Sequence, residues 1–221
     1  VDAIYNTNTQ GWGISDIENA IGTPLNNVSY TGSIVDYISK EDASIVLPED
    51  SKFYFGMHVD GYYMNSNPNN YDLSKAYTSE VKNMYGVFAN DEDFNQDISN
   101  WDISNVEDMR RMFQNNASFN QDISSWNISN VITMGGLFEN ATSFNQDISS
   151  WDFSNVVAMT SLFDNSGMSK DNFNKFLIRL YQQAKNNNLS LQSEIGAINM
   201  KYDNTSYEKF DGTIAEGITG K

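Results

Sequence analysis

Three aspartates recur at a fixed interval of 25 residues, each within the same six-residue motif, Phe-Asn-Gln-Asp-Ile-Ser. Apolar and polar residues alternate in this motif, which predicts a short strand with the aspartate on the solvent face. If such strands pair in parallel register, the carboxylates line up about 4.8 Å apart. They then repel one another unless a cation or a basic ligand lies among them, or unless neighbouring amides and hydroxyls donate hydrogen bonds to them. Both alternatives stay open, and the predicted ligand-binding residues of this repeat face are Asn95, Asp97, Asn120, Asp122, Asn145 and Asp147.

Aromatic side chains form a second candidate site. Tyr54, Tyr62 and Tyr63 lie close together in the N-terminal part of the chain, and we include them among the predicted ligand-binding residues. Together with Trp101 and Trp126 they could stack on the rings of a carbohydrate. The two tryptophans, however, also recur at the 25-residue interval, which favours a buried structural column over an exposed sugar platform.

The composition excludes several classes of chemistry. The chain of 221 residues has no cysteine, a single histidine and a formal net charge of −16. The absence of cysteine excludes thiol catalysis, disulfides and Cys-bound zinc, and one histidine cannot form a two-His metal site. We predict no cofactor, although the acidic residues 90–93 leave calcium open with a spacing unlike that of an EF-hand. The repeat supplies no asymmetric pair of acid and base, so we expect no enzyme.

The elements that must position these side chains follow from the repeat. After each predicted strand, apolar residues recur at helical spacing, as in Val106, Met109, Met112 and Phe113. One strand and one short helix cannot bury both apolar faces alone, but stacked copies can. We therefore predict an α/β fold, a leucine-rich-repeat-type solenoid of short parallel strands and short helices with N- and C-terminal caps. The strands should lie near residues 94–98, 119–123 and 144–148, and the helical turns near residues 105–115, 130–140 and 155–164.

Three parts of the chain are predicted. Residues 1–68 form an N-terminal α+β capping region, residues 69–167 form about four repeats, and residues 168–221 form a C-terminal cap. In the C-terminal cap, Ser169 can begin a helix with a regular apolar face, and Leu189 and Leu191 indicate one further strand. Caps are needed because terminal repeats otherwise expose the core to water.

One repeat resembles a known family. Residues 94–118, FNQDISNWDISNVEDMRRMFQNNAS, resemble the repeat of BspA-like leucine-rich surface proteins, whose pattern is F-N-x-D-[IL]-S-x-W-[DN]-x-S-N-V-x-x-M-x-x-[ML]-F. The match covers about residues 69–167. The resemblance implies an extracellular solenoid that serves adhesion or partner binding, with no catalytic residues to carry over.

We therefore expect a noncatalytic ligand-binding module of a bacterial cell-surface or secreted adhesin, which binds a protein or peptide through the repeat face. The alternatives are a carbohydrate-binding module and a structural spacer of a large adhesin. The expected partner is a host or neighbouring-cell surface protein or glycan. The acidic balance argues against nucleic acid. No apolar run approaches the ~18 residues of a membrane span, so we expect no direct membrane insertion. We also expect the chain to be a monomeric segment of a larger extracellular protein.

Overall fold

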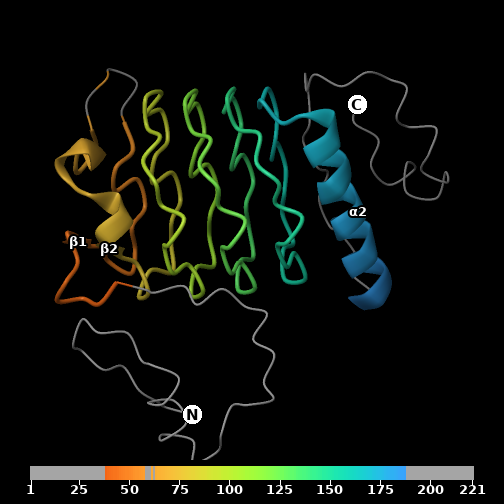
Figure 1. Ribbon diagram of the computed structural model, residues 1–221, viewed down its shortest axis with the longest axis horizontal. Coiled ribbons are helices and arrows are strands. Elements are labelled where there is room, and N and C mark those ends of the chain that lie inside the picture. The colour runs from red at the N-terminus through yellow and green to blue at the C-terminus, as the bar shows by residue number, and fades with distance from the viewer. Residues whose placement is uncertain (1–37, 58–60, 62, 188–221) are drawn as a thin grey trace, which may run out of the picture.

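The chain winds into successive coils that lie side by side along the long axis of the molecule (Figure 1). The computed structural model describes residues 38–57, 61 and 63–187. Near the start, strand β1 (Ile45–Val46) pairs in parallel with strand β2 (Ala76–Tyr77). Single parallel bridges then connect the following coils, from Asp50 to Asn83, Asn83 to Asp108, Asp108 to Thr133 and Thr133 to Ala158. From Asn83 onward each bridge advances by 25 residues, so that one repeat forms one coil.

Backbone hydrogen bonds between coils follow a simple alternation. The amides of Met84, Gly86 and Phe88 donate to carbonyls of the next coil at 2.8, 2.9 and 2.9 Å. The residues between them close turns within their own coil, as the amide of Val87 does with the carbonyl of Met84 at 3.3 Å. Every second amide therefore bonds as in a parallel sheet, while the chain itself is folded into a string of tight turns.

The short strand and the helix predicted within each repeat are not formed. Residues 94–98, 119–123 and 144–148 are not strands, and the parallel contacts run through the segments around Asn83 and Asp108 instead. Residues 105–115, 130–140 and 155–164 are turns and not helices. The physical reason is the backbone. A helix bonds its amides within one segment, whereas here they reach the next coil, and Arg111 and Asn115 have φ values of 56° and 57° that no right-handed helix accommodates.

Asparagines hold one of the left-handed positions in each of these coils. Asn90, Asn115, Asn140 and Asn165 have φ values of 62°, 57°, 59° and 56°. Apart from glycine, asparagine is among the residues that adopt this conformation most readily. Their side chains also form a ladder, because each carboxamide donates to the one before it, at 2.7, 2.6 and 2.9 Å along the series. The same residue type therefore satisfies the turn and ties the coils together.

The core consists of columns of identical side chains. Phe88, Phe113, Phe138 and Phe163 stack at centroid distances of 5.7, 5.8 and 5.9 Å. A second column, of Phe94, Phe119 and Phe144, stacks at 6.0 and 6.2 Å. The two columns also touch within each coil, at 3.6–3.8 Å. Val106, Met109, Met112 and Phe113 are fully buried, so the apolar spacing identified the buried positions although it indicated the wrong element.

The tryptophans form the buried column that their spacing favours. Trp101, Trp126 and Trp151 are 2%, 4% and 1% exposed. Each indole Nε1 donates to the backbone carbonyl of the residue 28 positions earlier, at 2.8, 3.1 and 3.0 Å, which are Leu73, Ile98 and Ile123. Each indole thus fills the core and satisfies a carbonyl of the preceding coil.

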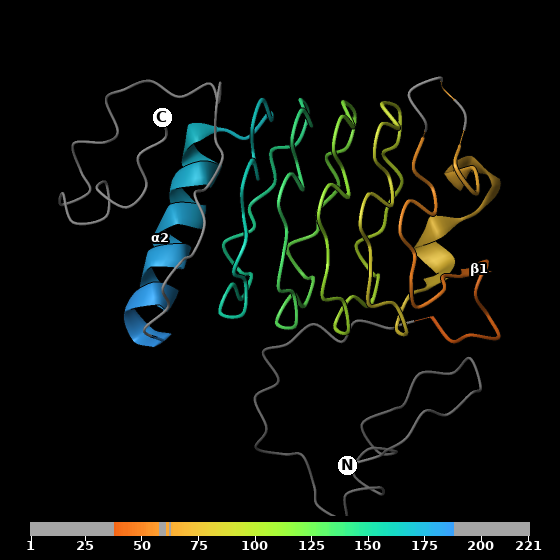
Figure 2. The same ribbon diagram turned by 180° about the vertical axis from the view of Figure 1, so that it is seen from behind.

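The two ends of the stack are closed differently. Residues 49–57 add a coil at the N-terminal end, where the amides of Ser51, Phe53 and Phe55 donate to carbonyls of the coil that begins at Asn83. No 25-residue spacing links this coil to the others, so periodicity could not reveal it. At the other end, helix α2 (Lys170–Asn187) begins after Ser169 as predicted and packs along the last coil (Figure 2). Residues 1–37 and 188–221, including the strand predicted at Leu189 and Leu191, lie outside the described residues.

Replacing Trp126 by alanine tests the tryptophan column. We expect Trp126→Ala to lower the free energy of unfolding by about 3–5 kcal/mol, because a cavity remains and the carbonyl of Ile98 loses its donor. Urea unfolding of both proteins measures the difference. A loss below ~1 kcal/mol would contradict a buried column.

The left-handed turns can be tested by two substitutions at one position. Asn115→Gly and Asn115→Ala both remove the carboxamide from the ladder, but only glycine holds a φ of 57° without strain. We expect the alanine variant to be less stable than the glycine variant by about 1 kcal/mol in urea unfolding. Equal stability of the two variants would contradict a strained backbone at this position.

Candidate ligand-binding face

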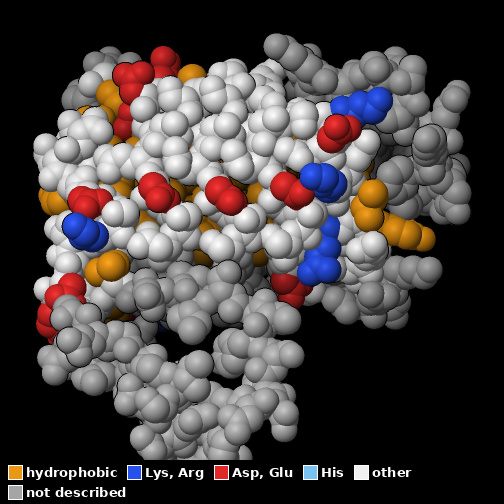
Figure 3. All heavy atoms as spheres, viewed as in Figure 1, with side chains coloured by type: hydrophobic (Ala, Val, Ile, Leu, Met, Phe, Trp, Pro, Cys, Tyr) orange, Lys and Arg blue, Asp and Glu red, His pale blue; other side chains and the backbone are white. Residues whose placement is uncertain are grey.

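A row of acidic side chains crosses one exposed face of the stack, with basic side chains at both ends (Figure 3). Asp72, Asp97, Asp122 and Asp147 occupy the same position on successive coils, since the coils are in a 25-residue register. We call these four residues the aspartate row. At its ends, Lys75 pairs with Asp72 at 3.1 Å and Lys175 pairs with Asp147 at 2.8 Å.

Each aspartate closes a local turn. The Oδ1 atoms of Asp97, Asp122 and Asp147 accept the backbone amide two residues later, at 3.0, 2.9 and 3.0 Å. This is the Asx turn that short polar side chains form with their own backbone. Hydrogen bonding by neighbours, one of the two alternatives for these carboxylates, is therefore present. Among the described residues, neither Asp97 nor Asp122 has a basic partner, and both side chains are exposed.

The asparagines beside the row have a structural role. The Oδ1 atom of Asn95 accepts the backbone amide of Asn120 at 2.9 Å and the side chain of Gln121 at 3.0 Å. Asn120 repeats both contacts with the following coil, and Asn145 accepts the amide of Ser169 at 2.8 Å. The predicted ligand-binding asparagines thus form a ladder that holds adjacent coils in register, and they lie exposed beside the carboxylates.

A shallow, open depression lies in the aspartate row between its last two members. Its volume is about 260 Å³. Polar side chains line it: Asp122, Ser124, Gln146, Asp147, Ser149 and Ser150. The floor is fixed, because the hydroxyl of Ser150 donates to the carbonyl of Ser124 at 2.6 Å. The depression can therefore accept a polar or cationic side chain without rearrangement of the coils.

Electrostatics at the row favour ammonium groups. The hydrogen bond from Lys175, together with that from Ser149, lowers the pKa of Asp147 to about 2. At the other end, hydrogen bonds from Ser74 and Lys75 hold the pKa of Asp72 below its usual range. The protein's own lysines at both ends thus illustrate how a basic side chain binds this row. Sequence reasoning missed Lys175, because only the fold brings α2 to Asp147, whereas Lys75 lies three residues after Asp72 in the sequence.

The predicted tyrosines do not join this face. Tyr54 is half-buried and its ring packs edge-on against Phe55 at 5.0 Å. The hydroxyl of Tyr63 donates to the buried Asp91 at 3.2 Å, and burial together with that carboxylate raises the pKa of Tyr63 to about 12. Tyr62 lies outside the described residues. Between described residues, no hydrogen bond, ion pair or ring contact connects Tyr54 or Tyr63 to the aspartate row.

Neither a metal centre nor a membrane span is found in the part of the chain that the structure describes. No three histidine or acidic side chains there are grouped to hold a metal ion. In the acidic loop considered for calcium, Asp91 is buried against Tyr63 and burial raises its pKa. The helices described are too short or too polar to cross a bilayer.

The fold and the face define a repeat protein of stacked 25-residue coils that carries a row of carboxylates on one surface. Residues 58–176 match the model of the family DUF285, described as a Mycoplasma protein of unknown function, and the chain belongs to this family. No curated protein and no solved structure is similar enough to match.

The pairing of Asp147 with Lys175 can be tested by titration. A pKa of about 2 means that Asp147 stabilises the fold above its unfolded pKa near 3.9, and that this contribution is lost as the pH falls toward 2. We expect Lys175→Gln to raise the pKa of Asp147 toward the ordinary value, measured by carboxyl ¹³C NMR. Lys40→Gln, which removes a lysine paired with Glu80, should leave the Asp147 titration unchanged. An unchanged pKa in the Lys175 variant would contradict the pairing.

Proposed function

We propose that this chain is a noncatalytic ligand-binding module of a bacterial cell-surface or secreted adhesin, and that it binds a protein or peptide through the repeat face. The observation that carries this proposal is the charge of Asp97 and Asp122. Both carboxylates are exposed, have no basic partner among the described residues, and lie between two carboxylates that lysines already occupy. A ligand with lysine or arginine side chains is complementary to this arrangement.

The rigidity of the face supports binding. Every coil is bonded to the next by backbone amides and by the asparagine ladder beside the row. A surface that is already ordered binds an extended segment without paying for its own immobilisation. The polar depression at Asp122 and Asp147 adds a place where one side chain of the ligand can insert.

The class and location of the protein are part of the proposal. We propose that the coils are a leucine-rich-repeat-type solenoid of the BspA-like kind, because their 25-residue pattern resembles that repeat and parallel bridges recur at the same interval. The location is then extracellular, and the partner is a surface protein of a host or neighbouring cell. The family description agrees with a bacterial source.

The burial of the tryptophan side chains weakens the carbohydrate-binding alternative. Trp101 and Trp126 are inside the core, so they cannot stack on a sugar ring. Of the aromatic side chains considered for this role, only Tyr54 and Tyr63 remain within the described residues, and both are packed against other groups. A protein or peptide with basic side chains fits the exposed face better than a neutral glycan does.

The experiment compares two asparagine substitutions with a matched control. Asn127 occupies the position of Asp102 one coil later and accepts the amide of Ser129 at 3.1 Å, so asparagine preserves an Asx turn. We expect Asp97→Asn/Asp122→Asn to retain its urea midpoint and to bind an extended peptide of alternating lysine and serine about tenfold more weakly, as two exposed ion pairs are lost.

Isothermal titration calorimetry at low and physiological salt measures these affinities. The control, Asp102→Asn, removes a carboxylate outside the aspartate row and should bind like the wild type. Equal binding by the double variant and the wild type would contradict the proposed function. A lowered unfolding midpoint together with unchanged binding would assign the row to a structural role.

A further inference from the structure

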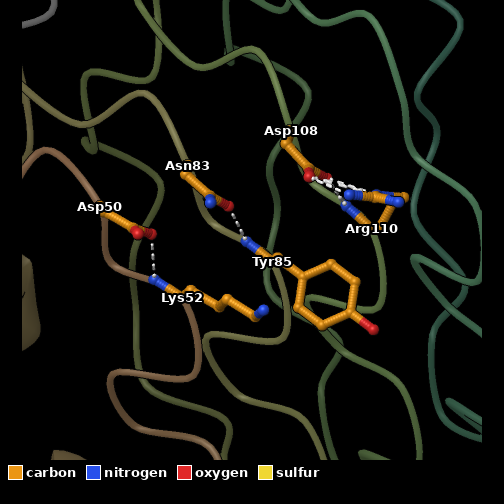
Figure 4. Close-up of polar contacts among 6 residues, drawn as sticks. All are labelled: Asp50, Lys52, Asn83, Tyr85, Asp108 and Arg110. Atoms are coloured by element: carbon orange, nitrogen blue, oxygen red, sulfur yellow. Dashed lines mark hydrogen bonds and ion pairs between the residues drawn. The ribbon is translucent and has the colours of Figure 1, made fainter.

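A second charged cluster lies on another segment of the coils, where the backbone bridges run. We call it the Tyr85 cluster: Lys52, Phe53, Tyr85, Arg110 and Arg111. The Tyr85 ring lies between Lys52 of the preceding coil and Arg110 of the following coil (Figure 4). Lys52 Nζ is 5.2 Å, Arg110 Cζ 5.1 Å and Arg111 Cζ 6.0 Å from the ring centroid. Three cations thus gather around one aromatic ring in a strongly acidic chain.

Two of these cations have no carboxylate partner among the described residues. Arg110 is bound to Asp108 at 2.7 Å, but no ion pair or side-chain hydrogen bond is made by Lys52 or Arg111. Among the other described cations, Arg179 also forms no ion pair, but its side chain donates to the carbonyl of Trp151 at 3.1 Å. Elsewhere in the described chain, an ion pair with a carboxylate is formed by each of Lys40, Lys75, Lys82 and Lys175. Lys52 and Arg111 therefore present free donors at the surface, held in place by the ring.

The backbone conformation at position 111 does not favour an arginine there. Arg111 has a φ of 56°, and the equivalent positions one coil before and one coil after are Gly86 and Gly136, with φ values of 62° and 66°. Glycine adopts this conformation without strain, whereas arginine does not. Gly136 is buried, and the stem of the Arg111 side chain and Glu139 lie over it, so a partner meets the Arg111 side chain and not the backbone of the next coil.

We propose that the Tyr85 cluster binds an acidic segment of another protein. Its carboxylates pair with Lys52 and Arg111, and the Tyr85 ring keeps both cations oriented. Since both head groups lie within 6.0 Å of the same ring centroid, carboxylates two residues apart on an extended segment, on the same face and roughly 7 Å apart, can reach both.

The charge of the whole chain favours a short acidic segment over a polyanion. A nucleic acid or an anionic membrane brings many negative charges against a chain of net charge −16, and three cations are a small footprint for a phosphate backbone. At physiological salt, exposed charges farther away than about 8 Å are largely screened. A segment with two or three carboxylates therefore senses mainly Lys52 and Arg111, together with the ion pair of Arg110 and Asp108.

The substitution Arg111→Gly tests binding by the cluster without lowering the stability of the fold. Arg111→Gly removes a cation and relieves the left-handed strain, so the variant should unfold at the same or a higher urea concentration. The probe is a fluorescent octapeptide of alternating glutamate and glycine. We expect Lys52→Gln/Arg111→Gly to bind it about tenfold more weakly than the wild type, as two exposed ion pairs are lost. Lys40→Gln, with the same charge change as Lys52→Gln, should bind like the wild type.

Four outcomes decide the proposal. Weaker binding of the glutamate peptide by the double variant, with unchanged binding of the lysine peptide, supports it independently of the aspartate row. Equal binding by all variants, or a marked loss of stability in Arg111→Gly, overturns it. Analytical ultracentrifugation tests whether a second copy of the chain binds to the Tyr85 cluster in place of an acidic peptide. Self-association of the wild type that the double variant abolishes overturns the peptide assignment in favour of a contact between copies.

Discussion

The hydrogen bonds between successive coils are the constraint on which the rest of the structure depends. Every second amide of the segment that begins at Met84 donates to the next coil, and the same pattern recurs one repeat later from Met109. Because these donors must meet their acceptors at each step, the coils from Asn83 onward have the same length, and equivalent side chains lie directly above one another. The phenylalanine and tryptophan columns follow from this register, as do the asparagine ladders.

Because of the same register, a residue that recurs in every repeat forms a continuous row on the surface. An aspartate at one position of the repeat becomes the aspartate row, since stacking brings each copy beside the next. A position that varies between repeats instead places unlike residues side by side, as at Lys52, Tyr85 and Arg110, which form a mixed cluster and not a uniform column. One scaffold thus carries an acidic face and a cationic, aromatic one, and the difference lies only in which positions repeat.

The sequence was sufficient for the period, the buried positions and the helix after Ser169, because all three depend on local patterns. It was insufficient for the elements within each repeat. Val106, Met109 and Phe113 have helical spacing, but a string of tight turns buries the same positions, and periodicity cannot separate the two. The left-handed φ of Arg111 has no signal in the residue type. The ion pair between Asp147 and Lys175 depends on where α2 packs, which is a property of the fold and not of any motif.

A comparison within the chain distinguishes charge from turn formation. At the Asx-turn position that follows each tryptophan, Asp102 and Asp152 alternate with Asn127, and all three accept an amide two residues later. The turn therefore does not require a negative charge. At the position of the aspartate row, by contrast, all four coils carry aspartate, although asparagine would close the same turn without repulsion between neighbours. Turn geometry explains a short polar side chain at this position but not its charge, and the charge is what a basic ligand would recognise.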